Sequence, residues 1–301
     1  MGQSELIGNY EREVEVLPRH LLRVVSRLKA ESNRLTVWSA RLFEQLKKAH
    51  VFANVVNRDY EGEINTFGDT VKINSIGSVS VKDYTKNNNI DDPETLDAAQ
   101  TILTIDQAKY FNFQVDDIDQ AQQNPKVMDA AMQEAGFALA DTADSHIAGF
   151  HTKASKEVEE TSLTSSNVYD VIAETAEKLD ENNVPRDGRF LVVPPFFTTA
   201  MTLAEILETK GSVDANESNQ NGWVGRLLGF DVWMSNNLKK SGDDTMALAG
   251  TRRAISYAEQ ILNMEGYRPE SRFADAVKGL HVYGAKVIDP KALVRLKVQK
   301  A

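Results

Sequence analysis

Three aspartates close together in the chain, Asp116, Asp117 and Asp119, have the clearest potential for chemistry. Clustered carboxylates can hold a divalent cation or act as general acid and base. The alternative is a solvated acidic stretch ahead of a helix N-terminus, where negative charge is favoured. We prefer the alternative, because no nucleophile–base pair is visible elsewhere in the sequence.

Other candidate ligands fail on spacing. His146 and His151 are five residues apart without the Glu of an HExxH pattern, so we predict no zinc helix and expect a histidine on the exposed side of a helix. Asp214, Asn216 and Ser218 lack the glycine and glutamate that complete a calcium loop. The chain has no cysteine and no GxSxG, P-loop or GxGxxG pattern. We therefore predict no metal, no cofactor and no catalytic residue.

The aromatic residues that stand out have a structural interpretation. Trp223 and Trp233 flank a glycine-rich corner, where core packing is the better explanation than ligand stacking. We expect the same of Tyr110, Phe111 and Phe113.

Composition excludes several classes of protein. Of the 301 residues, 42% are apolar and 26% are charged, which is ordinary for a globular chain. A net charge of -10 argues against a protein whose main task is to grip nucleic acid. No apolar run approaches the ~20 residues of a membrane helix, and the N-terminus lacks the order of a signal peptide. We expect a soluble cytosolic product with no membrane partner.

Two amphipathic helices are predicted near the N-terminus, over residues 17–30 and 37–50. The second has an apolar face of Trp38, Leu42, Phe43 and Leu46. The first has an apolar stripe, formed by Leu17, Leu21, Val24 and Leu28. A basic stripe lies beside it, formed by Arg19, Arg23 and Arg27.

Alternating segments on both sides of a polar tip at residues 86–93 predict a long β-hairpin. Because an isolated hairpin is only marginally stable, we expect this one to lie on a neighbouring molecule.

Beyond the hairpin, an apolar stripe predicts a helix of about 25 residues over 125–150. We interpret residues 153–166 as a polar linker. The remaining predictions are helices over 167–183 and 195–207, an exposed loop over 211–222, and strands over 190–193, 230–235, 245–250, 252–260, 280–289 and 292–298. The chain is therefore α+β, and its strand-rich end must return to an earlier sheet.

Several segments, in this order, resemble tailed-bacteriophage major capsid proteins. FANVVNRDYEGEI lies in the first, over residues 37–64, and IDQAKYFNFQVDDIDQ opens the third. The similarity covers residues 37–301. No single motif is diagnostic, but five dissimilar segments in family order are specific: 37–64, 68–87, 105–144, 182–195 and 272–298.

The resemblance implies the phage and herpesvirus shell fold, with a peripheral domain, an axial domain, an extended β-hairpin loop and an N-terminal arm. On that basis we expect an N-terminal extension and arm (1–60), the extended loop (61–115), the peripheral domain with its spine helix (116–165), the axial domain (166–250) and a return to the peripheral domain (251–301).

The implied function is self-assembly, in the host cytoplasm, into the icosahedral virion shell that encloses packaged double-stranded DNA. The implied partners are further copies of the chain, as pentamers and hexamers, together with scaffolding, portal and decoration proteins. DNA would be enclosed without sequence-specific binding. Two alternatives remain: an encapsulin-like nanocompartment shell of the same fold, and a soluble enzyme using Asp116, Asp117 and Asp119.

Two groups of residues are expected to act in assembly. The tip of the extended loop carries Lys82, Lys86, Asn87, Asn88 and Asn89. Some shells of this fold crosslink a loop lysine to a neighbour's asparagine, but no pattern identifies the partner asparagine or a catalytic Glu here. The other group is the 17–30 helix, whose apolar stripe we expect to dock on protein while its arginines face the lumen.

Overall fold

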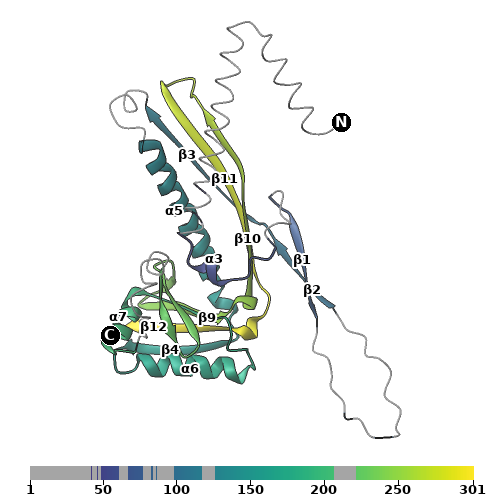
Figure 1. Cartoon of the computed structure of the whole chain (residues 1–301), viewed down its shortest axis with the longest axis vertical. Helices are drawn as coiled ribbons and strands as arrows, with labels where there is room; N and C mark the ends of the chain where they lie inside the picture. The colour runs from purple at the N-terminus through teal and green to yellow at the C-terminus, as the bar shows by residue number, and fades with distance from the viewer. Residues whose placement is uncertain are drawn as a thin grey trace, which may run out of the picture. The chain divides into compact units, whose positions relative to one another are not determined.

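The computed structural model describes residues 42, 46, 49–60, 67–76, 83, 86, 98–116, 126–206 and 222–301 (Figure 1). The chain forms two compact units. The described residues of the first fall within 1–45, 111–136 and 264–279, and those of the second within 46–110, 137–263 and 280–301. Within the described residues, helices and strands are mixed as an α+β chain requires.

A seven-stranded sheet in the second unit has the order β4-β12-β9-β5-β7-β6, with β8 paired to β9. Its central strands are buried on both faces, since every residue of β5 is buried and so are the last seven of β9. Such strands have continuous apolar sequences, which is why they were predictable. The strands are β4 (Lys156–Leu163), β5 (Arg189–Val193), β6 (Trp223–Leu227), β7 (Phe230–Met234), β8 (Lys239–Ser241), β9 (Asp244–Thr251) and β12 (Leu293–Lys300).

Strand β4 corrects the prediction of a linker over residues 153–166. It pairs in parallel with β12, with Val158 and Leu163 buried beneath it. Its glutamates on the exposed face pair with β12, Glu157 with Arg295 and Glu159 with Lys297. The segment is polar because it is an edge strand with a charged outer face.

Strand β12 also pairs antiparallel with β9, so the C-terminal strand does return to an earlier sheet. This sheet includes strands from both sides of the boundaries expected at residues 165 and 250, because β12 pairs with β9 of the segment expected to be axial and β4 pairs with β12.

Helix α5 (Lys126–Ala148) confirms the predicted long helix, and Met132, Leu139, Ala143 and Ile147 on the expected stripe are buried. A 3-10 turn, η2 (Gly149–Lys153), follows it. Helix α6 (Val168–Glu181) was also predicted, whereas α7 (Pro195–Leu203) ends before the expected 207. The backbone of Glu205 takes a positive φ of 55°, a left-handed conformation that ends a helix. Two short 3-10 turns are η4 (Arg252–Ala254) and η5 (Pro290–Ala292). No helix among the described residues is long and apolar enough to cross a membrane.

The predicted hairpin is divided between two sheets. Strands β1 (Thr70–Ile76) and β2 (Ala98–Thr104) pair antiparallel, from Thr70 opposite Thr104 to Ile76 opposite Ala98. The second strand of the hairpin was expected to continue beyond Thr104. The residues that follow instead form a separate strand, β3 (Gln107–Asp116), which joins a three-stranded sheet of order β10-β11-β3. Its other strands are β10 (Ile255–Tyr267) and β11 (Ala274–Val287).

The base of the β1–β2 hairpin has a small core of its own. Val71, Ile73, Leu103 and Ile105 pack with Ala258 of β10 and Val282 of β11, all at most 5% exposed. Gly284 of β11 makes this close approach possible, since a Cβ there would lie 2.3 Å from the carbonyl oxygen of Thr104. The hairpin is therefore anchored within its own subunit at its base.

Candidate functional site: a buried charge cluster

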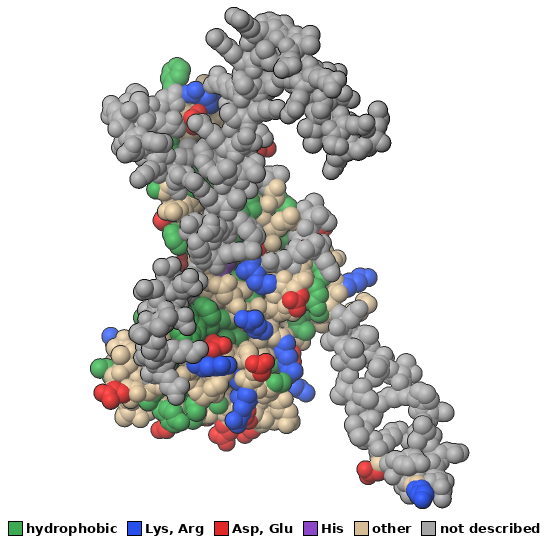
Figure 2. Space-filling view, in the orientation of Figure 1, with side chains coloured by type: hydrophobic (Ala, Val, Ile, Leu, Met, Phe, Trp, Pro, Cys, Tyr) green, Lys and Arg blue, Asp and Glu red, His purple; other side chains and the backbone are tan. Residues whose placement is uncertain are grey.

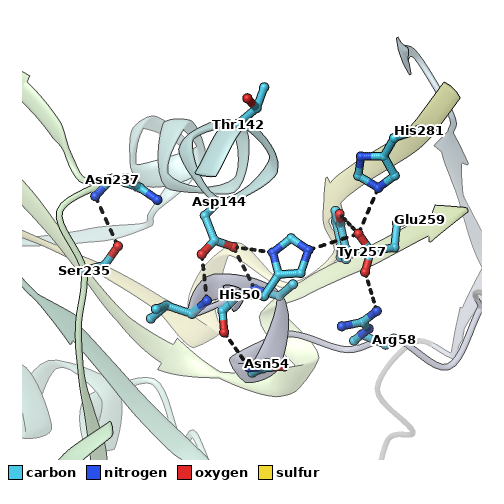
Figure 3. Close-up of polar contacts among 12 residues, drawn as sticks. His50, Asn54, Arg58, Thr142, Asp144, Ser235, Asn237, Tyr257, Glu259 and His281 are labelled. Carbon is cyan, nitrogen blue, oxygen red and sulfur yellow. Dashed lines mark hydrogen bonds and ion pairs between the residues drawn. The ribbon is translucent and has the colours of Figure 1, made fainter. Parts of the chain in front are cut away.

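A cluster of buried charged groups lies where four parts of the second unit meet (Figure 3). His50 stands just before the short helix α3 (Phe52–Val55). Its Nδ1 lies 3.0 Å from Oδ1 of Asp144 on α5, and its Nε2 lies 3.1 Å from Oε2 of Glu259 on β10. All three side chains are at most 3% exposed. One histidine therefore bridges two carboxylates out of contact with solvent.

Asp144 also holds the start of α3. Its Oδ2 accepts from the backbone N–H of Val51 at 2.7 Å, and its Oδ1 accepts from that of Ala53 at 3.3 Å. Helix N-termini have unpaired N–H groups, and a carboxylate satisfies them while complementing the helix dipole. A four-residue helix is too short to be stable alone, so α3 depends on this contact and on burial of Phe52 and Val55.

Glu259 is the centre of the cluster. Its Oε2 accepts from the Tyr257 hydroxyl at 2.7 Å and contacts Nε2 of His281 at 3.0 Å, and its Oε1 accepts from Arg58 at 2.6 Å. The guanidinium of Arg58 also lies 5.8 Å from the centre of the Tyr257 ring, within cation–π range. Four donors thus compensate the burial of one carboxylate.

The electrostatic consequences are large. Burial alone lowers the pKa of His50, but hydrogen bonds and charge from Asp144 and Glu259 outweigh it and raise that pKa to about 9. Burial alone raises the pKa of Glu259, but hydrogen bonds from His281 and His50, with the positive charges of His50 and Arg58, hold it well below its usual range. Burial, and then the charge of Glu259, raise the pKa of Tyr257 well above 10. His50 and Glu259 are therefore a charged pair at neutral pH.

The buried cluster has a structural role. The ring nitrogens and carboxylates are turned toward one another and have almost no exposed surface, so no substrate can reach them. Among the described residues no group of three or more His, Cys, Asp or Glu side chains could hold a metal ion. Buried, mutually satisfied charges instead fix the relative positions of the segments that carry them.

Of the residues predicted for metal or acid–base chemistry at the acidic cluster and for assembly, the structure describes Lys86 and Asp116. Lys86 and Asp116 are exposed, and Asp116 ends β3. The other predicted residues lie outside the described residues: Asp117 and Asp119; Lys82, Asn87, Asn88 and Asn89; Leu17, Leu21, Val24, Leu28, Arg19, Arg23 and Arg27; and Asp214, Asn216 and Ser218.

Two expectations were wrong. His146 is not on the exposed side of α5 but half-buried, with its ring edge-on to Phe150 and to Tyr283 of β11. Burial lowers the pKa of His146. Tyr110 was expected to pack in a core and is 78% exposed, since β3 is a sheet edge there.

The expectation of core packing holds better for the other aromatics. Trp233 packs against the main core, and Trp223 is its partner across β6 and β7. Phe111 and Phe113 are half-buried and stacked, with ring centres 5.9 Å apart.

The buried cluster was not predicted from the amino-acid sequence. Its members are far apart in the chain, with His50 separated from Asp144 by 94 residues and from Glu259 by 209. One signal was available: Glu259 and His281 lie in segments that are mostly apolar, ISYAEQIL and LHVYGA. An ionisable residue at a core position requires a partner.

No protein-family model and no curated protein sequence matches this chain. Solved structures do match it. A capsid chain of Mycobacterium phage Che8 is 30% identical, with a TM-score of 0.64 over 82% of this chain and 90% of that one. The capsid of the cyanophage P-SCSP1u is 15% identical, with a TM-score of 0.61 over 84% and 89%. A virus-like particle from Pyrococcus furiosus is 12% identical, with a TM-score of 0.55 over 85% and 96%.

The last two similarities show the fold alone, while the first, over most of both chains, shows the family. A shell protein of this kind is structural, which agrees with a cluster whose charged groups are buried and paired with one another. The chain belongs to the tailed-phage major capsid proteins, which assemble with copies of themselves into the icosahedral shell of the virion.

Proposed function

We propose that the shell built from this chain consists of pentamers and hexamers and encloses packaged double-stranded DNA without sequence-specific contacts. The charge of the chain supports this, because a net charge of -10 gives a wall that does not retain DNA during filling. On the face shown in Figure 2, blue and red side chains are interspersed over the described residues. Scaffolding, portal and decoration proteins are the other partners that we propose.

The observation that carries an assembly role for the extended loop is the anchored base of the β1–β2 hairpin. Six residues at most 5% exposed fix that base in its own subunit. The loop beyond it carries Lys86, which is exposed. We propose that Lys82, Lys86, Asn87, Asn88 and Asn89 contact a neighbouring copy.

Deletion of residues 80–93 tests this role. The base stays intact in that variant, so we expect a near-normal melting transition together with failure to form closed shells by electron microscopy. Normal shells from the deletion would show that the loop is not an assembly element.

For the 17–30 helix we propose docking on protein at the inner face, through Leu17, Leu21, Val24 and Leu28. Burying four such side chains stabilises by several kcal/mol, at roughly 1.5 to 3 each before ordering costs. Removing residues 1–36 should misdirect assembly. Changing Arg19, Arg23 and Arg27 to Gln should leave empty shells intact, and loss of shells from that triple variant alone would contradict the proposed orientation.

The enclosed material distinguishes a phage shell from a nanocompartment of the same fold. Particles from infected cells should release nuclease-protected double-stranded DNA when disrupted. Particles that contain a protein cargo and no DNA would favour the nanocompartment.

For the domains, we propose that residues 166–250 form the axial domain and that residues 116–165 and 251–301 form the peripheral domain. Strands β4 and β12 of the peripheral segments then join the axial sheet.

A further inference from the structure

The segment of residues 50–58, here called the strap, is attached to the second unit in two ways. Apolar side chains are the first, since Phe52, Ala53, Val55 and Val56 are at most 4% exposed. Polar contacts are the second. The backbone of Asn57 donates to Ile255 and accepts from Tyr257, and His50 and Arg58 reach Glu259 from the two ends of the strap.

Both hydrogen bonds of the His50 ring exist only while His50 carries two protons. Ionised carboxylates only accept hydrogen bonds, so both ring nitrogens of His50 must donate, one to Asp144 and one to Glu259. Protonated His50 then lies between two carboxylates, and Arg58 binds the far oxygen of Glu259. The other titratable groups that contact Glu259 are the Tyr257 hydroxyl, which donates to it, and Nε2 of His281.

We propose that His50 is an alkaline-labile lock on the strap: loss of its second proton releases residues 50–58 from α5 and β10 while the seven-stranded sheet stays folded.

Loss of that proton has a local effect for a physical reason. One of the two hydrogen bonds of His50 becomes a contact between two acceptors, and the two buried carboxylates lose the cation that lies between them. Moving the strap into water relieves this, because Asp144 and Glu259 become hydrated. Apolar side chains of β5, β9 and β12 form the core of the sheet, into which Phe52, Val55 and Val56 of the strap also pack. These side chains do not titrate, so we expect the strands to keep their own packing when the strap leaves. Because the pKa of His50 is raised from 6.5 to about 9, the strap should lose its stabilisation as pH rises from 6.5 to about 9.

Hydrogen–deuterium exchange of the assembled full-length protein between pH 6 and 9.8, corrected for the intrinsic exchange rate at each pH, tests the lock. We expect amides of the strap to lose tenfold or more of their protection, with a midpoint between pH 6.5 and about 9. Peptides from β12 should keep theirs. A strap that keeps its protection up to pH 9.8, or that loses it together with β12, overturns the proposal.

Asp144→Asn sharpens the test, because the charge that stabilises protonated His50 is gone while the single amide oxygen can still accept from the backbone N–H of Val51, the shorter of the two hydrogen bonds to the start of α3. The midpoint should fall by at least one pH unit. His151→Gln is the matched control, a histidine on η2 outside the cluster, and its midpoint should equal that of the wild type. An unchanged midpoint in Asp144→Asn contradicts the lock, and if that variant does not fold, the wild-type titration decides alone.

Discussion

Two sets of ion pairs in the second unit have similar chemistry and opposite surroundings. The buried cluster joins His50, Asp144 and Glu259 at no more than 3% exposure. The pair between β4 and β12 joins Glu157 and Arg295, whose side chains are 39% and 28% exposed. Both sets link segments more than 90 residues apart. Water can solvate the charges of the Glu157–Arg295 pair, but not those of the buried cluster.

The difference teaches which charges the fold depends on. An exposed pair gains little, because water solvates each partner when the other is removed. A buried pair also contributes little relative to an apolar pair, yet removing one partner leaves an unpaired charge in the interior. The buried cluster is thus where single substitutions do most damage, and the β4–β12 pairs tolerate them.

Glu259→Gln should have the largest effect. It leaves protonated His50 with one carboxylate and Arg58 with a weaker acceptor in the interior, which costs about 3 to 5 kcal/mol of unfolding free energy. Denaturant unfolding of the full-length protein measures this. A loss below about 1 kcal/mol would show that the buried cluster behaves like an exposed pair.

The pH dependence of stability comes next. Because the pKa of His50 is raised from 6.5 to about 9, its contribution is complete below pH 6.5 and is lost as pH rises through about 9. The full loss is about 3 kcal/mol. Glu259 acts in the opposite sense, because its lowered pKa gives a contribution that is present above pH 4.5 and lost as pH falls below that value. Unfolding free energies measured from pH 4 to 10 should therefore be largest between pH 4.5 and 6.5, where both contributions are complete. Asp144→Asn should reduce the decline in unfolding free energy at alkaline pH.

Tyr257→Phe should have an intermediate effect. It removes one of four donors to Glu259 and leaves the charge balance unchanged, so the cost is about 1 to 2 kcal/mol. The same unfolding experiment measures it. An effect as large as that of Glu259→Gln would mean that hydrogen bonding, and not charge balance, dominates in the cluster.

Glu157→Gln should have the smallest effect, about 0.2 to 1 kcal/mol, and 1 M salt should remove most of it. The variants in the buried cluster should keep their effects in salt, because little solvent reaches them. A large, salt-insensitive loss in Glu157→Gln would break the comparison between the two sets.

The amino-acid sequence alone determined the elements with strong periodicity and the family. The stripe from Met132 to Ile147 predicted α5, and the apolar run over 190–193 predicted β5, because each element buries its side chains at the spacing of its own backbone. Five ordered segments identified the shell fold, and the 30% identical phage chain confirms it.

Only the tertiary structure decided β4, the end of β2 and the buried cluster. Residues 156–163 are polar, and their strand exists because β12 supplies both the backbone partner and the cations Arg295 and Lys297. The ladder of β1 and β2 ends at Thr104 because β3 pairs with β11 instead. His50 became a buried cation because α5 and β10 bring Asp144 and Glu259 to its two ring nitrogens. Local periodicity is encoded over a few residues, whereas charge compensation depends on groups that only the fold brings within 3 Å or so.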